Sequence, residues 1–196
     1  YMLLPYLKEF IHRNPHISIS IECQSTNETL KLLDDDKIDI GLIGKPTSLK
    51  TFNFYYLDNI EDIFVTTKDY LRNLSARGVK KSEILQNSTL MLLDKGNMTR
   101  KYIDDYLQEN QIRVKDSIDI SNMDLLIDFA KIGVGVACVI KSIVSKELAD
   151  GTLIEIPLGI PIHKREVGVA YKESSKLSTS LQTFIKFYES YTPEDF

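Results

Sequence analysis

The pattern of apolar and polar positions switches between two periods along the chain. Apolar residues recur every three or four positions over residues 3–11, which predicts a helix that ends at Asn14-Pro15. Residues 17–23 alternate between apolar and polar side chains, which predicts a strand. A helix from Ser25 and a buried strand over 38–43 complete a helix–strand–helix–strand order. That order favours parallel strands joined by crossover connections.

The alternation restarts in the middle of the chain. Strands are predicted over 52–57 and 62–67 with a turn at Asp58-Asn59, whereas residues 68–88 are polar and irregular apart from a short helix from Ser82. Further strands are predicted at 89–93, 117–120, 134–140, 153–156 and 166–171, with helices around 102–107, 121–132, 141–149 and 181–188. We therefore expect two α/β units in series, with a final strand and helix returning to the first unit.

Composition narrows the class of protein. The chain has 196 residues, 43% of them hydrophobic and 27% charged, which is typical of a folded domain and excludes a wholly disordered chain. No apolar run is long enough for a transmembrane helix, so no membrane partner is expected. The 24 basic and 28 acidic residues give a net charge of −4, which argues against this segment holding a nucleic-acid backbone by itself.

The cysteines and the first residues indicate a compartment. Cys23 and Cys138 lie far apart inside apolar runs, which favours two buried thiols in a reducing cytoplasm over a disulfide framework. Residues 1–5 lack the basic region and the cleavage site of a signal peptide. Because the chain begins at the mouth of an amphipathic helix, we expect that part of the protein precedes it.

The sequence contains no recognisable catalytic, metal-binding or cofactor-binding motif. The three histidines, at 12, 16 and 163, are scattered, and Asp34–Asp36 lacks the spacing and the glycine of a calcium loop. Gly133-Val-Gly135 precedes a strand instead of following one, and Cys138 stands where a dinucleotide fingerprint needs its third glycine. Nothing in the sequence therefore favours an enzyme.

Polar helix starts are the remaining candidates. Each follows the end of a predicted parallel strand, where open α/β sheets bind ligands, and helix N-termini suit anions. Plain N-capping explains each start separately, but it does not explain why the caps fall at equivalent positions in both halves. The candidate residues are Ser25, Thr26 and Asn27 in the first half and Asn97, Met98, Thr99, Arg100, Ser121 and Asn122 in the second.

Several segments resemble one family in order and spacing. They are Tyr1–Phe10 followed by Asn14-Pro15 and its alternating strand, Leu33 with Lys37–Ile43, Asn122–Ala137, and Gly151–Leu153. In this order they resemble the effector-binding domain of LysR-type bacterial transcriptional regulators, over essentially the whole chain.

The resemblance implies an α/β fold with two Rossmann-like lobes joined by two crossover strands, similar to type 2 periplasmic binding proteins. Lobe one would be residues 1–66 plus 162–196, and lobe two 67–161. The crossovers would fall near 65–68 and 158–164. DNA would be bound by a winged helix-turn-helix domain that, like the family's first strand, has no counterpart in this sequence.

A function follows from the same resemblance. A small, anionic effector would bind between the lobes at the polar helix starts, with Met98 and Ile43 as apolar walls and Arg100 as a candidate charge. The regulator would form a homodimer or a tetramer, and Leu32 and Ile127 are apolar residues beyond the main helix stripes that an interface would bury. Two alternatives stay open: a solute-binding protein of a transporter, which a signal peptide would favour, and an enzyme on the same scaffold.

Overall fold

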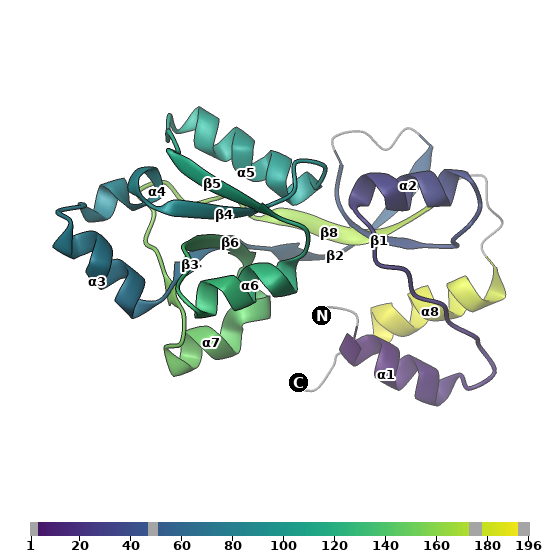
Figure 1. The fold of residues 1–196 in the computed structure, drawn as a ribbon. Helices are drawn as coiled ribbons and strands as arrows, with labels where there is room; N and C mark the ends of the chain where they lie inside the picture. The colour runs from purple at the N-terminus through teal and green to yellow at the C-terminus, as the bar shows by residue number, and fades with distance from the viewer. Residues whose placement is uncertain (1–3, 47–50, 173–177, 192–196) are drawn as a thin grey trace. The chain divides into compact units, whose positions relative to one another are not determined.

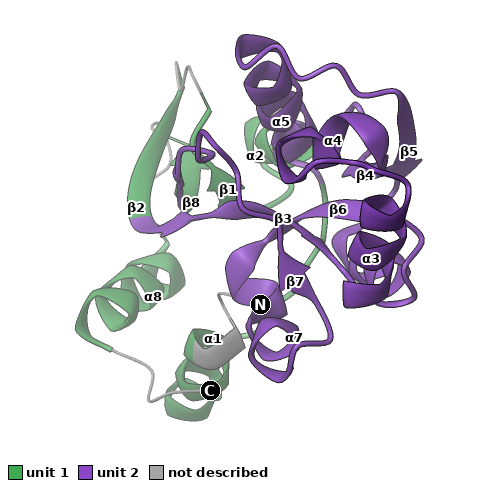
Figure 2. Ribbon diagram, turned by 90° about the vertical axis from the view of Figure 1, so that its left-hand side faces the viewer, with its two compact units in different colours: residues 1–24, 28–56, 168–196 green, residues 25–27, 57–167 purple. Residues whose placement is uncertain are grey.

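The computed structural model describes residues 4–46, 51–172 and 178–191, which form a mixed α/β fold (Figure 1). The chain divides into two units built from interleaved segments (Figure 2). Unit 1 comprises residues 1–24, 28–56 and 168–196, and unit 2 comprises residues 25–27 and 57–167. Apart from residues 25–27, the chain passes between the units at Tyr56/Leu57 and Val167/Gly168, whereas the resemblance implied crossovers near 65–68 and 158–164.

The strands of unit 1 belong to a three-stranded sheet in the order β1-β8-β2, formed by Gly41–Gly44, Arg165–Lys172 and Phe52–Ile60. Residues 165–167 of β8 and 57–60 of β2 are already part of unit 2. Helices α1 (Leu4–Arg13), α2 (Thr26–Asp34) and α8 (Thr179–Ser190) complete the unit. Leu33 of α2 packs on Ile43 and Ala170 in one core cluster. Phe10 of α1 contacts the rings of Phe184 and Phe187 of α8, with centroids 5.2 and 5.4 Å apart.

The strand predicted over residues 17–23 does not form. Residues 17–25 carry no regular secondary structure, and Ile21 is 65% exposed. Alternation marks a strand only where a neighbouring strand supplies hydrogen bonds and a core receives the apolar face. In the part of the chain that the structure describes, the three-stranded sheet ends at β1, and this segment is not paired to it.

Unit 2 contains a five-stranded sheet in the order β5-β4-β6-β3-β7. The strands are β3 (Asp62–Thr66), β4 (Thr89–Leu93), β5 (Asp116–Ile120), β6 (Val136–Ile140) and β7 (Ile154–Glu155). β4 pairs in parallel with both β5 and β6, so α5 and α6 each connect parallel strands, as expected of an α/β unit. β3 is antiparallel to both β6 and β7. Because Asp62 is opposite Ile140, the start of β3 lies at the edge where the parallel strands end.

Helices cover both faces of this sheet (Figure 1). Leu90 and Leu92 of β4 face a core that includes Ile103 and Tyr106 of α5 (Met98–Glu109). Met91 and Leu93, the alternate residues, face the opposite core with Leu126 of α6 (Met123–Lys131). The remaining short helices are η1 (Lys81–Glu83), α4 (Ile84–Asn87), η2 (Lys141–Val144) and α7 (Ser145–Asp150). A strand inside two layers is apolar on both faces, which explains the continuous run from Leu90 to Leu93.

Three local predictions were wrong. Residues 68–76, predicted as irregular, form helix α3 (Lys68–Ala76), which Thr67 caps by accepting a hydrogen bond from the Tyr70 N–H at 3.2 Å. The helix was missed because its apolar stripe is short and only Leu74 is buried. Asp58 and Asn59 lie within β2 and not in a turn. Cys23 is exposed, so only Cys138 is a buried thiol.

Candidate ligand-binding site

The carboxyl edge of the unit 2 sheet contains a topological switch point. From β4 the chain continues into α5 on one face, and from the adjacent strand β5 it continues into α6 on the other face. Helices that leave neighbouring strands toward opposite faces open a crevice between their first turns. The candidate residues of the second half, 97–100 and 121–122, lie at these two helix starts (Figure 1).

The start of α5 offers donors to a ligand. Asn97 is the N-cap, and its side-chain oxygen accepts the Thr99 N–H at 2.8 Å. The other N–H groups of the first turn have no partner within the helix, and they lie at the positive end of the helix dipole. Met98 and Thr99 are half-buried beside them. This arrangement suits a carboxylate or another oxyanion.

The start of α6 is arranged in the same way, but with a different cap from the one expected. The sequence predicted that this helix begins at Ser121, whereas the N-cap is Asn122, whose side-chain oxygen accepts the Leu125 N–H at 2.9 Å. Asn122 has an extended backbone, and its side chain accepts a hydrogen bond from the first turn of the helix, as a serine at the N-cap would. Ser121 is exposed, and among the described residues its hydroxyl makes no hydrogen bond.

Arg100 is not available to a ligand in this structure. It is 6% exposed, and its guanidinium donates to Asp104 at 2.8 Å, to the Leu93 carbonyl at 2.9 Å and to Asp119. Burial opposes the charged form, but the two carboxylates hold the pKa of Arg100 above its ordinary value. Arg100 therefore ties α5 to the ends of β4 and β5 and leaves the candidate charge of this site to another residue.

That other residue is Arg165, which the sequence analysis did not identify. Arg165 begins β8, and its guanidinium grips both carboxylate oxygens of Asp62, with Nε–Oδ2 at 2.6 Å and Nη2–Oδ1 at 2.9 Å. Nη2 also donates to the Thr99 hydroxyl at 3.2 Å, and the guanidinium lies 5.2 Å from the centre of the Tyr102 ring. In the sequence, Asp62 and Arg165 stand out only as charged residues at the ends of apolar strands. Nothing in the sequence indicates that these two residues, 103 positions apart, form a pair.

The residues predicted in the first half are placed differently. Thr26 and Asn27 open α2, and Ser25–Asn27 group with unit 2 although the rest of α2 belongs to unit 1. Ile43 is 2% exposed and packs in the core of unit 1 with Leu33 and Ala170. A side chain enclosed in this way has no surface left for a ligand, so Ile43 is not retained as an apolar wall.

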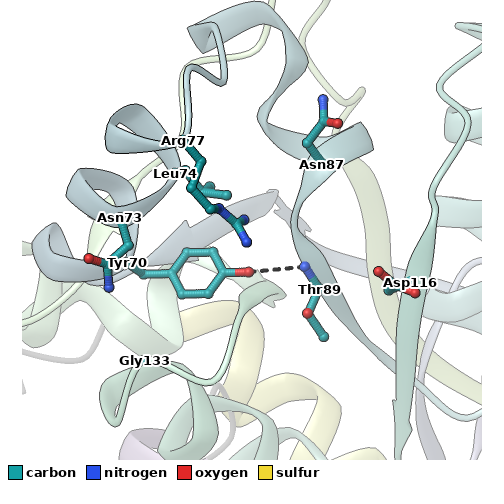
Figure 3. Close-up of a pocket in the computed structure, with 8 residues that line it drawn as sticks. All are labelled: Tyr70, Asn73, Leu74, Arg77, Asn87, Thr89, Asp116 and Gly133. Atoms are coloured by element: carbon teal, nitrogen blue, oxygen red, sulfur yellow. Dashed lines mark hydrogen bonds between the residues drawn. The ribbon is translucent and has the colours of Figure 1, made fainter.

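A separate hollow of about 380 Å³ lies at the amino ends of β4 and β5, the opposite edge of the same sheet (Figure 3). Its floor includes Tyr70, whose hydroxyl accepts the Thr89 N–H at 3.0 Å. Arg77, directly after α3, and Asp116 of β5 border it, and both are exposed. The hollow contains none of the residues predicted to bind a ligand.

The described residues form no cluster of metal ligands, and the thiol of Cys138 is buried. Among residues 4–46, 51–172 and 178–191, no group of three or more His, Cys, Asp or Glu side chains is arranged to hold a metal ion. Burial raises the pKa of the Cys138 thiol well above its ordinary value, with Asp62 acting in the same direction. No helix in the described part of the chain is both long and apolar enough to cross a membrane.

These features define the class of protein before any relative is considered. Two interleaved α/β units, with polar helix starts at the carboxyl edge of a mainly parallel sheet, are the architecture of type 2 periplasmic-binding-protein-like ligand-binding domains. Within that class the chain belongs to one family, described as the LysR substrate binding domain, which it matches over residues 1–192. The resemblance inferred from the sequence is thereby confirmed.

Curated relatives are transcriptional regulators of greater length. The chain is 25% identical over 193 residues to the HTH-type transcriptional activator CmpR of Synechocystis sp. (strain PCC 6803), covering 95% of this chain and 61% of CmpR. It is 22% identical over 188 residues to the HTH-type transcriptional regulator YeiE of Escherichia coli (strain K12), covering 95% of this chain and 63% of YeiE. The chain thus spans less than two thirds of these relatives.

Solved structures support the same fold. The regulatory domain of CcmR from Synechocystis PCC6803, in complex with 2-PG, superposes with a TM-score of 0.83 at 18% identity, covering 96% of this chain and 89% of that one. The effector-binding domain of QuiR, in complex with shikimate, gives a TM-score of 0.75 at 16% identity, covering 93% and 86%.

Proposed function

We propose that this chain is the effector-sensing domain of a LysR-type transcriptional regulator and that it binds a small anionic molecule without chemical change. The observation that carries the proposal is that helices α5 and α6 begin after the ends of two adjacent strands, β4 and β5, at the switch point of the unit 2 sheet. Each start presents backbone donors, with Thr99 and Ser121 adding hydroxyl groups. The ligands named for two structural neighbours, 2-PG and shikimate, agree with an anionic effector.

A thermal-shift screen tests this site. The probes are inorganic phosphate, sulfate, acetate, shikimate and 2-PG, added to the wild type, to Ser121→Ala and to the matched control Ser82→Ala, which alters an exposed serine of η1. A ligand at a hundred times its Kd contributes about 2.7 kcal/mol, which raises the Tm of a chain of this size by several degrees. We expect the wild type and Ser82→Ala to be stabilised equally and Ser121→Ala less.

Two results would change the proposal. If a hit stabilises Ser121→Ala as much as the wild type, Ser121 does not contact the ligand. If no anion stabilises the wild type, the preference for an anionic effector is wrong.

We propose further that the regulator self-associates through unit 2, as a homodimer or a tetramer. Ile132 is 73% exposed at the end of α6, and Leu125 is 40% exposed seven positions earlier on the same face of the helix. Ile118 of the edge strand β5 is 38% exposed. Ile127, expected at the interface, is 6% exposed and belongs to the core, and Leu32 is only half-buried. In an isologous dimer the same surface of both subunits forms the contact, so the exposed apolar residues of each subunit would be buried.

We propose that DNA binding is not an activity of residues 1–196, because this chain covers only 61% and 63% of the two regulators named above. A net charge of −4 gives this chain no electrostatic attraction for DNA, so we expect sequence-specific binding to be absent from it. A mobility-shift assay that detected specific, salt-sensitive binding by this chain would contradict that expectation. Because a regulator acts where the DNA is, we place it in the bacterial cytoplasm. The relatives named above are regulators and not transporter components, so the solute-binding alternative is not favoured.

A further inference from the structure

The donors of Arg165 are only partly used inside the protein. Nε and one N–H of Nη2 hold Asp62, and the other N–H of Nη2 holds the Thr99 hydroxyl oxygen. A guanidinium has five N–H donors, so both N–H groups of Nη1 remain. Within the described residues they meet no acceptor. The side chain is 13% exposed, so a path to solvent remains open.

The surroundings hold this guanidinium in one orientation. The Asp62 side chain is fully buried, and a bidentate pair fixes the plane of the guanidinium as well as its position. The Tyr102 ring lies against it, and the Tyr102 hydroxyl donates to the His163 carbonyl at 2.8 Å. Arg165 is therefore positioned before any ligand arrives, so little side-chain entropy is lost when one binds.

Thr99 connects this guanidinium to the start of α5. Its hydroxyl oxygen accepts from Nη2, so its hydroxyl proton is left to donate elsewhere, and in the described part of the chain no group accepts it. Because the guanidinium is planar, one of the two unused N–H groups of Nη1 lies next to the Nη2 N–H that contacts Thr99. Thr99 is the second residue of α5, beside the unpaired N–H groups of the first turn.

We infer that Arg165 and Thr99 together bind the anionic group of the ligand, with Arg165 as the residue that selects a carboxylate or phosphate over a neutral group. This inference rests on the proposed function, because it concerns the same helix start. Arg165 supplies the positive charge that had been expected of Arg100. Thr99 supplies a neutral hydroxyl donor, which the hydrogen bond from Arg165 orients.

The test compares two kinds of variant by calorimetric titration. The probe is whichever of inorganic phosphate, sulfate, shikimate and 2-PG gives the largest thermal shift with the wild type. Arg165→Lys keeps the positive charge. A lysine ammonium group, however, lacks the planar guanidinium that can bind Asp62 and a ligand at the same time. Its matched control is Arg113→Lys, which alters an exposed arginine. Asp62→Asn/Arg165→Gln replaces the buried ion pair by a neutral pair without changing the net charge.

We expect both Arg165 variants to weaken binding roughly ten- to hundredfold, the usual range for a charge-assisted hydrogen bond, and the control to bind like the wild type. Thr99→Val should weaken binding by about three- to tenfold and Thr99→Ser should restore it. The Thr99 pair keeps the inference testable if an Arg165 variant does not fold.

The outcomes separate this inference from the proposed function. If the probe binds the wild type and is weakened by Ser121→Ala, but binds the Arg165 and Thr99→Val variants unchanged, the assignment of Arg165 is overturned and the proposed site stands. If the wild type binds none of the probes, both are overturned.

Discussion

The hydroxyl of Tyr106 donates a 2.6 Å hydrogen bond to the carbonyl of Ile160, 54 residues further along the chain. Tyr106 lies in the C-terminal half of α5, and the segment that contains Ile160 leads into β8. Together with the Tyr102–His163 and Arg165–Thr99 contacts, this bond holds the helix that carries the candidate site against the returning chain.

Tyr106→Phe tests the strength of this connection. Loss of the hydroxyl removes one hydrogen bond from a residue that is 8% exposed, so the free energy of unfolding should fall by about 1 kcal/mol, and by up to about 3 kcal/mol if the Ile160 carbonyl finds no water. Urea denaturation followed by circular dichroism measures it. Tyr171→Phe is the control, because the Tyr171 hydroxyl makes no hydrogen bond within the described residues. Equal stability of both variants would contradict the prediction.

The Asp62–Arg165 pair predicts a larger effect. Asp62→Ala leaves the Arg165 guanidinium without its carboxylate partner in a mostly buried position, which typically costs about 3–5 kcal/mol. The double variant Asp62→Leu/Arg165→Met removes both charges, and we expect it to recover most of that loss. Chemical denaturation of the three proteins gives the comparison. A double variant as unstable as the single one would show that the charges do not act as a pair.

Gly168 predicts a steric effect in unit 1. A Cβ at this position would collide with the Tyr55 carbonyl and the Phe54 ring, because β8 and β2 approach closely there. We expect Gly168→Ala to lower the free energy of unfolding by about 1–3 kcal/mol. Gly96→Ala is the matched control, since nothing lies within 4 Å of a Cβ built there. If thermal denaturation shows the same Tm for both, the two strands are further apart than described.

The two cysteines should react with thiol reagents at very different rates. Cys23 is exposed and Cys138 is buried, with its pKa raised well above the ordinary value by burial. A maleimide should label one thiol per native chain at pH 7.5 and two after denaturation, and mass spectrometry of peptides should place the native label on Cys23. Because the neutral thiol of Cys138 is favoured in the fold, its contribution to stability is complete below the unfolded pKa of about 8.5 and declines as the pH rises further. Rapid native labelling of Cys138 would contradict this.

Ile132→Glu tests self-association. A charge at a residue that is 73% exposed should leave the fold intact but oppose burial of the α6 surface in an isologous contact. Light scattering should show a dimer or larger species for the wild type and a shift toward monomer for the variant. Ile160→Glu, at an exposed isoleucine outside this surface, is the control. If the wild type is monomeric at high concentration, the proposed self-association is wrong.

Local periodicity predicted most of the helices and strands. Strand β4 was predicted at its observed bounds, and the helix predicted to end at 149 ends at Asp150, where Gly151 is the C-cap with a φ of 76°. Such features depend on nearby residues: a run of apolar side chains, a cap, or a residue that tolerates a left-handed backbone. The strand expected over 17–23 failed because a strand also needs a partner, which local periodicity does not supply.

The candidate site shows the same division. By itself, the sequence determined which helix starts carry polar residues, because N-capping depends on residues within one turn, and Asn97 and Asn122 both cap as side chains of that kind do. Only the tertiary structure decided which partners each arginine binds. Arg100 finds Asp104 on its own helix and Asp119 on β5, whereas Arg165 reaches Asp62 and Thr99 across 103 and 66 residues. The partners of a charge are set by the sheet order that brings distant segments to one edge, and no spacing along the chain encodes that proximity.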